Sequence, residues 1–179
     1  MTRYQPRIPT ASASGVCQGK EKVTAYYASN HEPEIRGVDT LPKELKEDIL
    51  GCKSKSAKYR QYLAQRFIDI ICGKMGIKSV KVKVHDKPRP KSEDKDGNSC
   101  QLYGQYVFDG ADSPIKLEIW NRTAVKKDRI PNGAFLDTLE HEFIHHYDVC
   151  MLQFKTSPHT KGFFRRIKKL DELFGKGVG

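Results

Sequence analysis

The chain has 179 residues and a net charge of +10, with 30% charged and 37% hydrophobic residues. This length suits one ordinary domain with a tail, and the apolar fraction is sufficient for a packed core. No apolar run approaches the ~18 residues that cross a bilayer, so we expect neither a membrane span nor a membrane partner. The positive charge favours phosphate-rich partners without identifying one.

Residues 1–38 contain few apolar residues, scattered Pro and Ser, and no regular period, which predicts a disordered basic N-terminal arm. The segment lacks the apolar core of a secretory signal, although its Arg, Ser and Ala content leaves organelle targeting open. The five cysteines form no CxxC pair, which is typical of a reducing compartment. We therefore expect a cytoplasmic protein, with a nucleoid or DNA-associated location as an option.

Residues 39–176 are predicted to form one domain. Apolar residues at helical spacing indicate a short helix over 41–49 and a longer one over 56–75, which Gly76 ends. Period-two alternation then predicts strands, and helical spacing returns toward the C-terminus. The predicted strands cover residues 80–84, 101–108 and 115–119, and the predicted later helices cover 131–152 and 161–175. This order favours an α+β domain with a small three-stranded antiparallel or mixed sheet.

The segment HEFIH, residues 141–145, lies within the first of these later helices. His141 and His145 are one helical turn apart and face the same way, whereas Glu142 is rotated by roughly 100°. Two imidazoles so placed can hold one metal ion, and the carboxylate can reach a water beside it, which is the HExxH pattern of zinc peptidases. The opposite side of the helix carries apolar residues for packing: Leu136, Leu139, Phe143, Tyr147 and Cys150.

Two downstream residues are candidates for a third ligand. Asp148 shares the histidine face, but it lies roughly 10 Å along the helix axis from His141. We therefore expect Asp148 behind the ligands, where it orients an imidazole or ends the helix. His159 follows the segment QFKTSP, which can reverse the chain, and is the better candidate.

The stretch DTLEHEFIHHY, residues 137–147, followed by SPHTKGFF, residues 157–164, resembles the active-site region of SprT-like zinc metallopeptidases. Residues 100–104 and the strand IKLEI are similar to the short strands that precede the helix in this family. Two departures stand out. Thr160 replaces the Gly that often follows the third histidine, and the chain has no Cys-rich zinc ribbon after the domain.

The resemblance implies a zincin-like fold and one zinc ion held by His141, His145 and His159. It also implies that Glu142 is the general base and that, as in some members, the substrates are DNA-associated proteins. We therefore expect a zinc metallopeptidase that hydrolyses a protein or peptide substrate. The strand IKLEI, residues 115–119, is expected to be the sheet edge to which an extended substrate adds.

The last predicted helix carries a basic cluster, which the sequence places on its outer face. Its members are Lys161, Arg165, Arg166, Lys168 and Lys169. A solvated helix face is the default interpretation, and contact with nucleic acid is the sharper one. The alternative function is accordingly a non-catalytic nucleic-acid-binding module with a structural zinc site, and a third hypothesis combines the two as a DNA-recruited protease.

Overall fold

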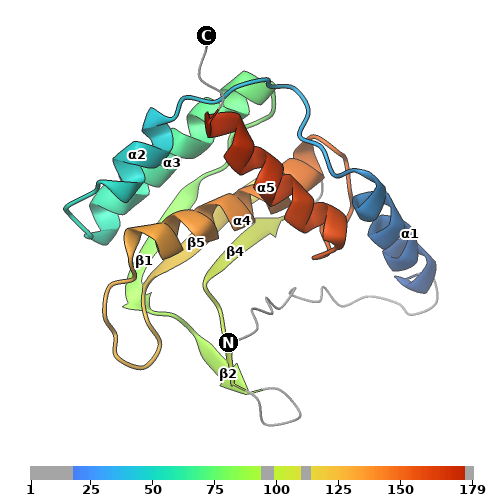
Figure 1. The fold of residues 1–179 in the computed structure, drawn as a ribbon. Coiled ribbons are helices and arrows are strands. Elements are labelled where there is room, and N and C mark those ends of the chain that lie inside the picture. Colours follow the sequence, from blue (N-terminus) through green and yellow to red (C-terminus); the bar gives the residue numbers. More distant parts are fainter. Residues whose placement is uncertain (1–17, 94–98, 110–113, 176–179) are drawn as a thin grey trace.

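The computed structural model of the chain describes residues 18–93, 99–109 and 114–175, which form five helices, a three-stranded sheet and a two-stranded ribbon (Figure 1). The helices are α1 (Gln18–His31), α2 (Glu44–Leu50), α3 (Ala57–Met75), α4 (Asn132–Cys150) and α5 (Lys161–Gly175). The strands are β1 (Val82–Pro88), β2 (Lys91–Glu93), β3 (Ser99–Gln101), β4 (Gly104–Phe108) and β5 (Pro114–Arg122). The predicted α+β class is confirmed.

The central strand of the three-stranded sheet is β5. The strand order is β1-β5-β4, with β1 parallel to β5 and β4 antiparallel to it, so the sheet is mixed. The prediction that residues 115–119 form a sheet edge is therefore wrong, because β5 is hydrogen-bonded on both sides. Among the described residues, the outer strand that packs against α4 is β4.

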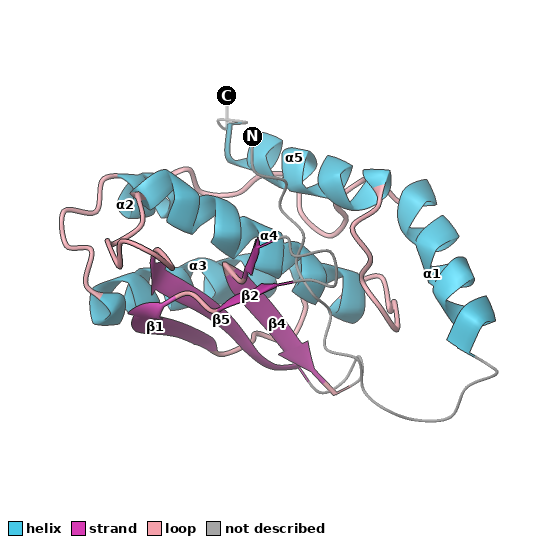
Figure 2. Cartoon of the chain, turned by 90° about the horizontal axis from the view of Figure 1, so that it is seen from below, coloured by secondary structure: helices cyan, strands magenta, loops and turns pink. Residues whose placement is uncertain are grey.

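Alternate side chains of the sheet form one buried face. Val82 pairs with Leu117, which pairs with Tyr106, and all three side chains are buried. Lys83 and Glu118, which pair with each other, belong to the opposite and more exposed face. Helix α3 packs on β1, and α4 packs on β4 and β5, so the helices lie on one side of the sheet (Figure 2).

A further helical layer covers α4. Helix α5 packs on α4, and α1 packs on α5 at the edge of the molecule (Figure 1). The ring of Phe67 in α3 stacks on that of Phe174 in α5, with centroids 5.6 Å apart, which extends one apolar core through the helices. Within the described residues, no helix has the length and apolar character needed to cross a membrane.

The prediction of a disordered arm over residues 1–38 is wrong for the part that the structure describes. Residues 18–31 form α1, and Ser29 on this helix is fully buried. Helix α1 packs against α5 through a buried polar residue, Ser29, so its sequence shows no apolar periodicity that would predict a helix. Residues 1–17 lie outside the described residues.

The single strand predicted over residues 101–108 is two strands in the structure. β3 pairs with β2 in the ribbon, and β4 pairs with β5 in the sheet. The change of partner occurs at Leu102 and Tyr103: the Leu102 N–H donates to the carbonyl of Pro90, and the Trp120 N–H donates to that of Tyr103. Both strands are extended, so a continuous run of strand-forming residues does not show where the pairing partner changes.

Helix α3 ends at the predicted residue, Gly76, and begins with a side-chain cap. Ser56 caps its first turn by accepting a hydrogen bond from the Tyr59 N–H at 3.3 Å. Gly76 ends the helix at φ 69°, in the left-handed region that glycine tolerates best.

Arg60 in α3 ties the helix to the loop that leads into α4. Its guanidinium is buried and donates to Asn121 Oδ1 at 2.5 Å, the Ile130 carbonyl at 2.8 Å and Asn132 Oδ1 at 2.6 Å. Asn132 is the first residue of α4, so this guanidinium fixes where the histidine-bearing helix begins.

We predict that Arg60→Ala lowers the free energy of unfolding by about 3 kcal/mol, since several buried acceptors lose their donor. Arg66→Ala on the same helix is the matched control. Arg66 forms a half-exposed ion pair with Asp48, whose loss should cost at most about 1 kcal/mol. Urea unfolding of both variants measures the difference, and equal losses would contradict the role given to Arg60.

Candidate metal centre

Three histidine side chains from two segments converge at the C-terminal half of α4. His141 and His145 project from successive turns of the helix, and His159 comes from the loop before α5. Nε2 of His159 lies 2.9 Å from Nε2 of His141 and 3.0 Å from Nε2 of His145. The structure thus brings together the three residues predicted as metal ligands, and they could hold one metal ion.

The protonation state of the three imidazoles suits a metal ion. Burial lowers the pKa of His141 to about 3, with the neighbouring His159 adding to the effect. Burial also lowers the pKa of His159 to about 4 and, with the two other imidazoles, that of His145 well below its usual value. All three are therefore neutral near pH 7, which is the form that binds metal.

The spacing of the three nitrogens also suits a metal ion. A single N–H can satisfy only one of the two short contacts of His159 Nε2, whereas a cation among the three nitrogens accepts every lone pair. Zinc with tetrahedral ligands at 2.0–2.1 Å separates two nitrogens by roughly 3.3 Å. The two separations from His159 Nε2, 2.9 and 3.0 Å, are close to that value, and the three ligand atoms all lie within 4.8 Å of one another.

Hydrogen bonding on the far side of His145 fixes its tautomer. Ser157 Oγ donates to Asp148 Oδ2 at 2.7 Å, so it accepts from the Nδ1–H of His145 at 2.8 Å. The proton on Nδ1 leaves the lone pair of Nε2 directed at the other histidines. Asp148 thus lies behind the ligands, as expected, but it reaches His145 through Ser157. Sequence analysis missed Ser157, because a serine in a loop carries no signal of its own.

The carboxylate of Asp148 belongs to a fully buried ion pair. Arg166 Nη2 donates to Asp148 Oδ2 at 2.8 Å, and neither side chain is exposed. Burial raises the pKa of Asp148 to about 6, although Arg166 and Ser157 both act to lower it. Asp148 is therefore mostly ionised near pH 7.

The ring of Phe163 forms one wall of the histidine cluster. Its centroid lies 5.0, 4.6 and 4.9 Å from those of His141, His145 and His159, respectively. Phe163 is fully buried, so it limits how far each imidazole can rotate. The next residue, Phe164, is half exposed and stacks beside His159 at 6.1 Å, at the rim of the site.

Glu142 lies between α4 and the backbone of β4. It is 2% exposed, and a Cβ added at Gly104 would come within 2.7 Å of both its Cγ and its Oε1. The same Cβ would lie 2.7 Å from Cγ2 of Thr138. Gly104 therefore lets the outer strand of the sheet pass directly against the carboxylate. The sequence showed this glycine only as one residue of a predicted strand.

Thr160, the residue that follows His159, has a defined place. Its Oγ1 accepts from the Phe163 N–H at 3.1 Å and so caps the first turn of α5. The same oxygen lies 2.7 Å from Ser29 Oγ of α1. Thr160, the residue next to His159, is thus held at a fixed point between two helices, α1 and α5.

The prediction that Arg166 faces solvent is wrong. Its guanidinium is fully buried and bonds to Asp148 and α1, so Arg166 cannot contact nucleic acid. Lys161, Arg165 and Lys168 are exposed, and Lys169 is partly exposed and pairs with Glu172 at 3.1 Å.

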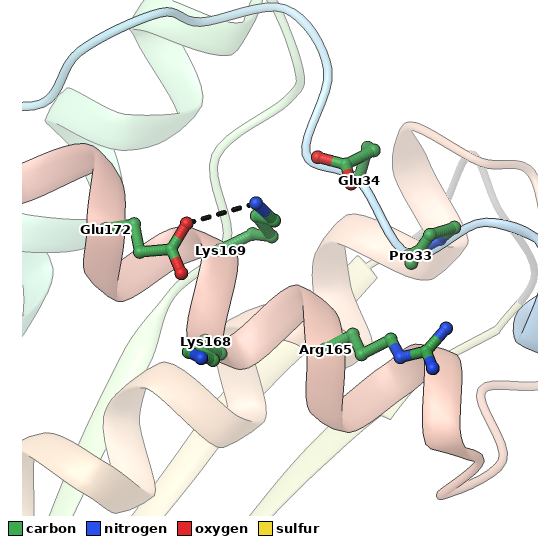
Figure 3. A pocket seen from close by; sticks show the side chains of 6 residues that line it. All are labelled: Pro33, Glu34, Arg165, Lys168, Lys169 and Glu172. Atoms are coloured by element: carbon green, nitrogen blue, oxygen red, sulfur yellow. Dashed lines mark hydrogen bonds and ion pairs between the residues drawn. The ribbon is translucent and has the colours of Figure 1, made fainter.

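Three members of the basic cluster, Arg165, Lys168 and Lys169, line a shallow pocket of about 350 Å³ (Figure 3). Its other lining residues are Pro33, Glu34 and Glu172. The two carboxylates reduce the positive charge of this surface, so the pocket is not a strong site for phosphate.

His146 does not belong to the cluster. It is fully buried, with Nδ1 3.1 Å from the Tyr106 hydroxyl and Nε2 2.8 Å from the Lys78 carbonyl. These contacts tie α4 to the sheet and to the loop before β1. His146 therefore has a structural role.

Comparison with known proteins identifies no relative. The chain matches no protein-family model, no curated protein and no solved structure.

We predict that the protein binds one zinc ion and that His159→Ala lowers its zinc affinity by more than ~100-fold, since loss of even an outer partner of a ligand costs 10–100-fold. Competition with a chromophoric chelator measures both affinities. His31→Ala is the matched control, because His31 is exposed at the end of α1 and should not alter binding. Equal affinities for wild type and His159→Ala would rule out the three-histidine centre.

Proposed function

We propose that this protein is a zinc-dependent metallopeptidase of the SprT-like, zincin type. The observation that carries the proposal is the convergence of three neutral imidazoles, two of them from the helix that carries Glu142, a buried carboxylate outside the ligand set. A structural zinc site has no use for a carboxylate in that position. Hydrolysis of a peptide bond requires a proton acceptor there.

The proposed roles follow from the positions of the side chains. His141, His145 and His159 would hold the ion. When bound, zinc would lower the pKa of a water to about 7 and polarise a carbonyl group. Glu142 would accept the proton of the attacking water and pass it to the leaving amine. Ser157 and Phe163 keep the imidazoles in the orientation that binding requires.

The strand that would receive the substrate is β4. No other strand of the described residues pairs with β4 on the side away from β5. Its first residue, Gly104, lies against Glu142. An extended peptide that adds to β4 through main-chain hydrogen bonds would pass close to the carboxylate. This proposal replaces the expected role of β5 as the edge.

The alternative remains a nucleic-acid-binding module with a structural zinc site. Lys161, Arg165 and Lys168 support it, because they are exposed along α5, the helix whose first turn packs against the histidines. In the combined hypothesis the same residues bring a peptidase to DNA-associated proteins. Because Arg166 is buried, the exposed basic cluster has one residue fewer than predicted. This weakens both the nucleic-acid-binding module and the combined hypothesis.

We predict that Glu142→Gln abolishes hydrolysis of a denatured protein substrate, with a loss of at least ~100-fold, while zinc content and fold stay unchanged. Glu140→Gln is the matched control on the same helix. Glu140 is buried beside Lys46, and burial raises its pKa to about 7, so the neutral amide is a mild replacement. If neither wild type nor any variant cleaves protein, and Glu142→Gln still binds DNA, the module is correct.

We predict that Gly104→Ala lowers kcat on the order of 100-fold, because its Cβ displaces the Glu142 carboxylate and misplacement by about 1 Å has such an effect. Zinc affinity should not change. Gly133→Ala on α4 is the control, since a Cβ there meets no atom within 4 Å. Steady-state kinetics on a peptide substrate, with zinc content measured in parallel, tests this. Unchanged kcat would show that β4 does not position Glu142.

A further inference from the structure

We infer that α1 sets the geometry of the metal centre and that Ser29 is the positioning residue through which it acts. The inference rests on the proposed function only in requiring that the three histidines hold a metal ion. Ser29 is fully buried at the contact between α1 and α5. From there, hydrogen bonds lead to both histidine-bearing segments, α4 and the loop before α5.

The first connection runs through Arg166. Its Nη2 donates to Ser29 Oγ at 3.0 Å and to Asp148 Oδ2 at 2.8 Å, and its Nη1 donates to the Ser29 carbonyl at 3.0 Å. Nη1 also donates to the carbonyl of Glu32, just after α1. Helix α1 and the residue that follows it therefore supply three acceptors of a buried guanidinium. Asp148 then orients Ser157, and Ser157 orients His145.

The second connection is direct. Ser29 Oγ lies 2.7 Å from Thr160 Oγ1, and Thr160 is covalently attached to His159. The Ser29 hydroxyl thus contacts both Thr160, next to the ligand His159, and the guanidinium of Arg166. Loss of this hydroxyl loosens both segments at once.

Gly162 allows α1 to approach closely enough for these bonds. A Cβ at this position would lie 1.8 Å from the Ser29 carbonyl oxygen and 3.0 Å from Asn30 Cα. The Gly162 N–H also donates to Asn30 Oδ1 at 3.3 Å. Backbone of α1 therefore occupies the space that any other residue at 162 would fill.

Two substitutions test the inference by different means. Ser29→Ala removes one buried oxygen, and Gly162→Ala keeps every polar group but forces α1 away. Each should lower zinc affinity about 10-fold, as expected for the outer partners of ligands. Each should also change the visible absorption spectrum of the cobalt-substituted protein, which reports ligand geometry. The double variant should lose little more than the more affected single variant, because both act through one contact.

The controls are Ser54→Ala, at an exposed site, and Gly175→Ala at the end of α5, where a Cβ meets no atom within 4 Å. Both should leave zinc affinity unchanged. A Ser29→Ala protein that melts at a lower temperature but keeps wild-type zinc affinity and cobalt spectrum overturns the inference, and it does so even if Gly162→Ala fails to fold. That outcome leaves the proposed function intact, whereas a wild-type protein that binds no zinc overturns both.

Discussion

The candidate site depends on keeping three imidazole nitrogens directed at one point. Lone pairs at 2.9 and 3.0 Å repel unless a proton or a cation lies between them, and burial keeps the pKa of each ring too low for added protons to help near neutral pH. The surrounding structure must therefore supply the restraint. It does so with the wall of Phe163 and the Ser157 hydrogen bond to His145.

Much of that restraint comes from a buried ion pair, in which the cost of desolvating both charges offsets much of their attraction. Arg166 and Asp148 are both fully buried, so removal of one would leave the other uncompensated. The pair joins α4 to α5, and through Ser29 it joins α1 to both. Stability of the fold and orientation of the site thus share the same few bonds, which explains how a helix remote in sequence can influence the histidines.

Sequence analysis predicted the parts that short-range periodicity encodes. Helices α2 to α5, the α+β class, and the common direction of His141 and His145 all follow from spacing within a few residues. The central place of β5 could not follow, because alternation specifies a buried face and not which neighbours a strand pairs with. Arg166 was misplaced for a related reason: basic residues are usually exposed, and its partner Asp148 is distant in sequence.

Helix α1 shows where such prediction ends. Its important side chain is Ser29, whose contact with Thr160 spans 131 residues and leaves no periodic trace. Thr160 stands where SprT-like peptidases often have glycine. In the structure the threonine hydroxyl caps α5 and meets Ser29, two bonds that a glycine could not make. Thr160 is thus paired with α1, the helix whose Ser29 contacts it. The loop that presents His159 is held on one side by this contact and on the other by the bond from Ser157 to Asp148.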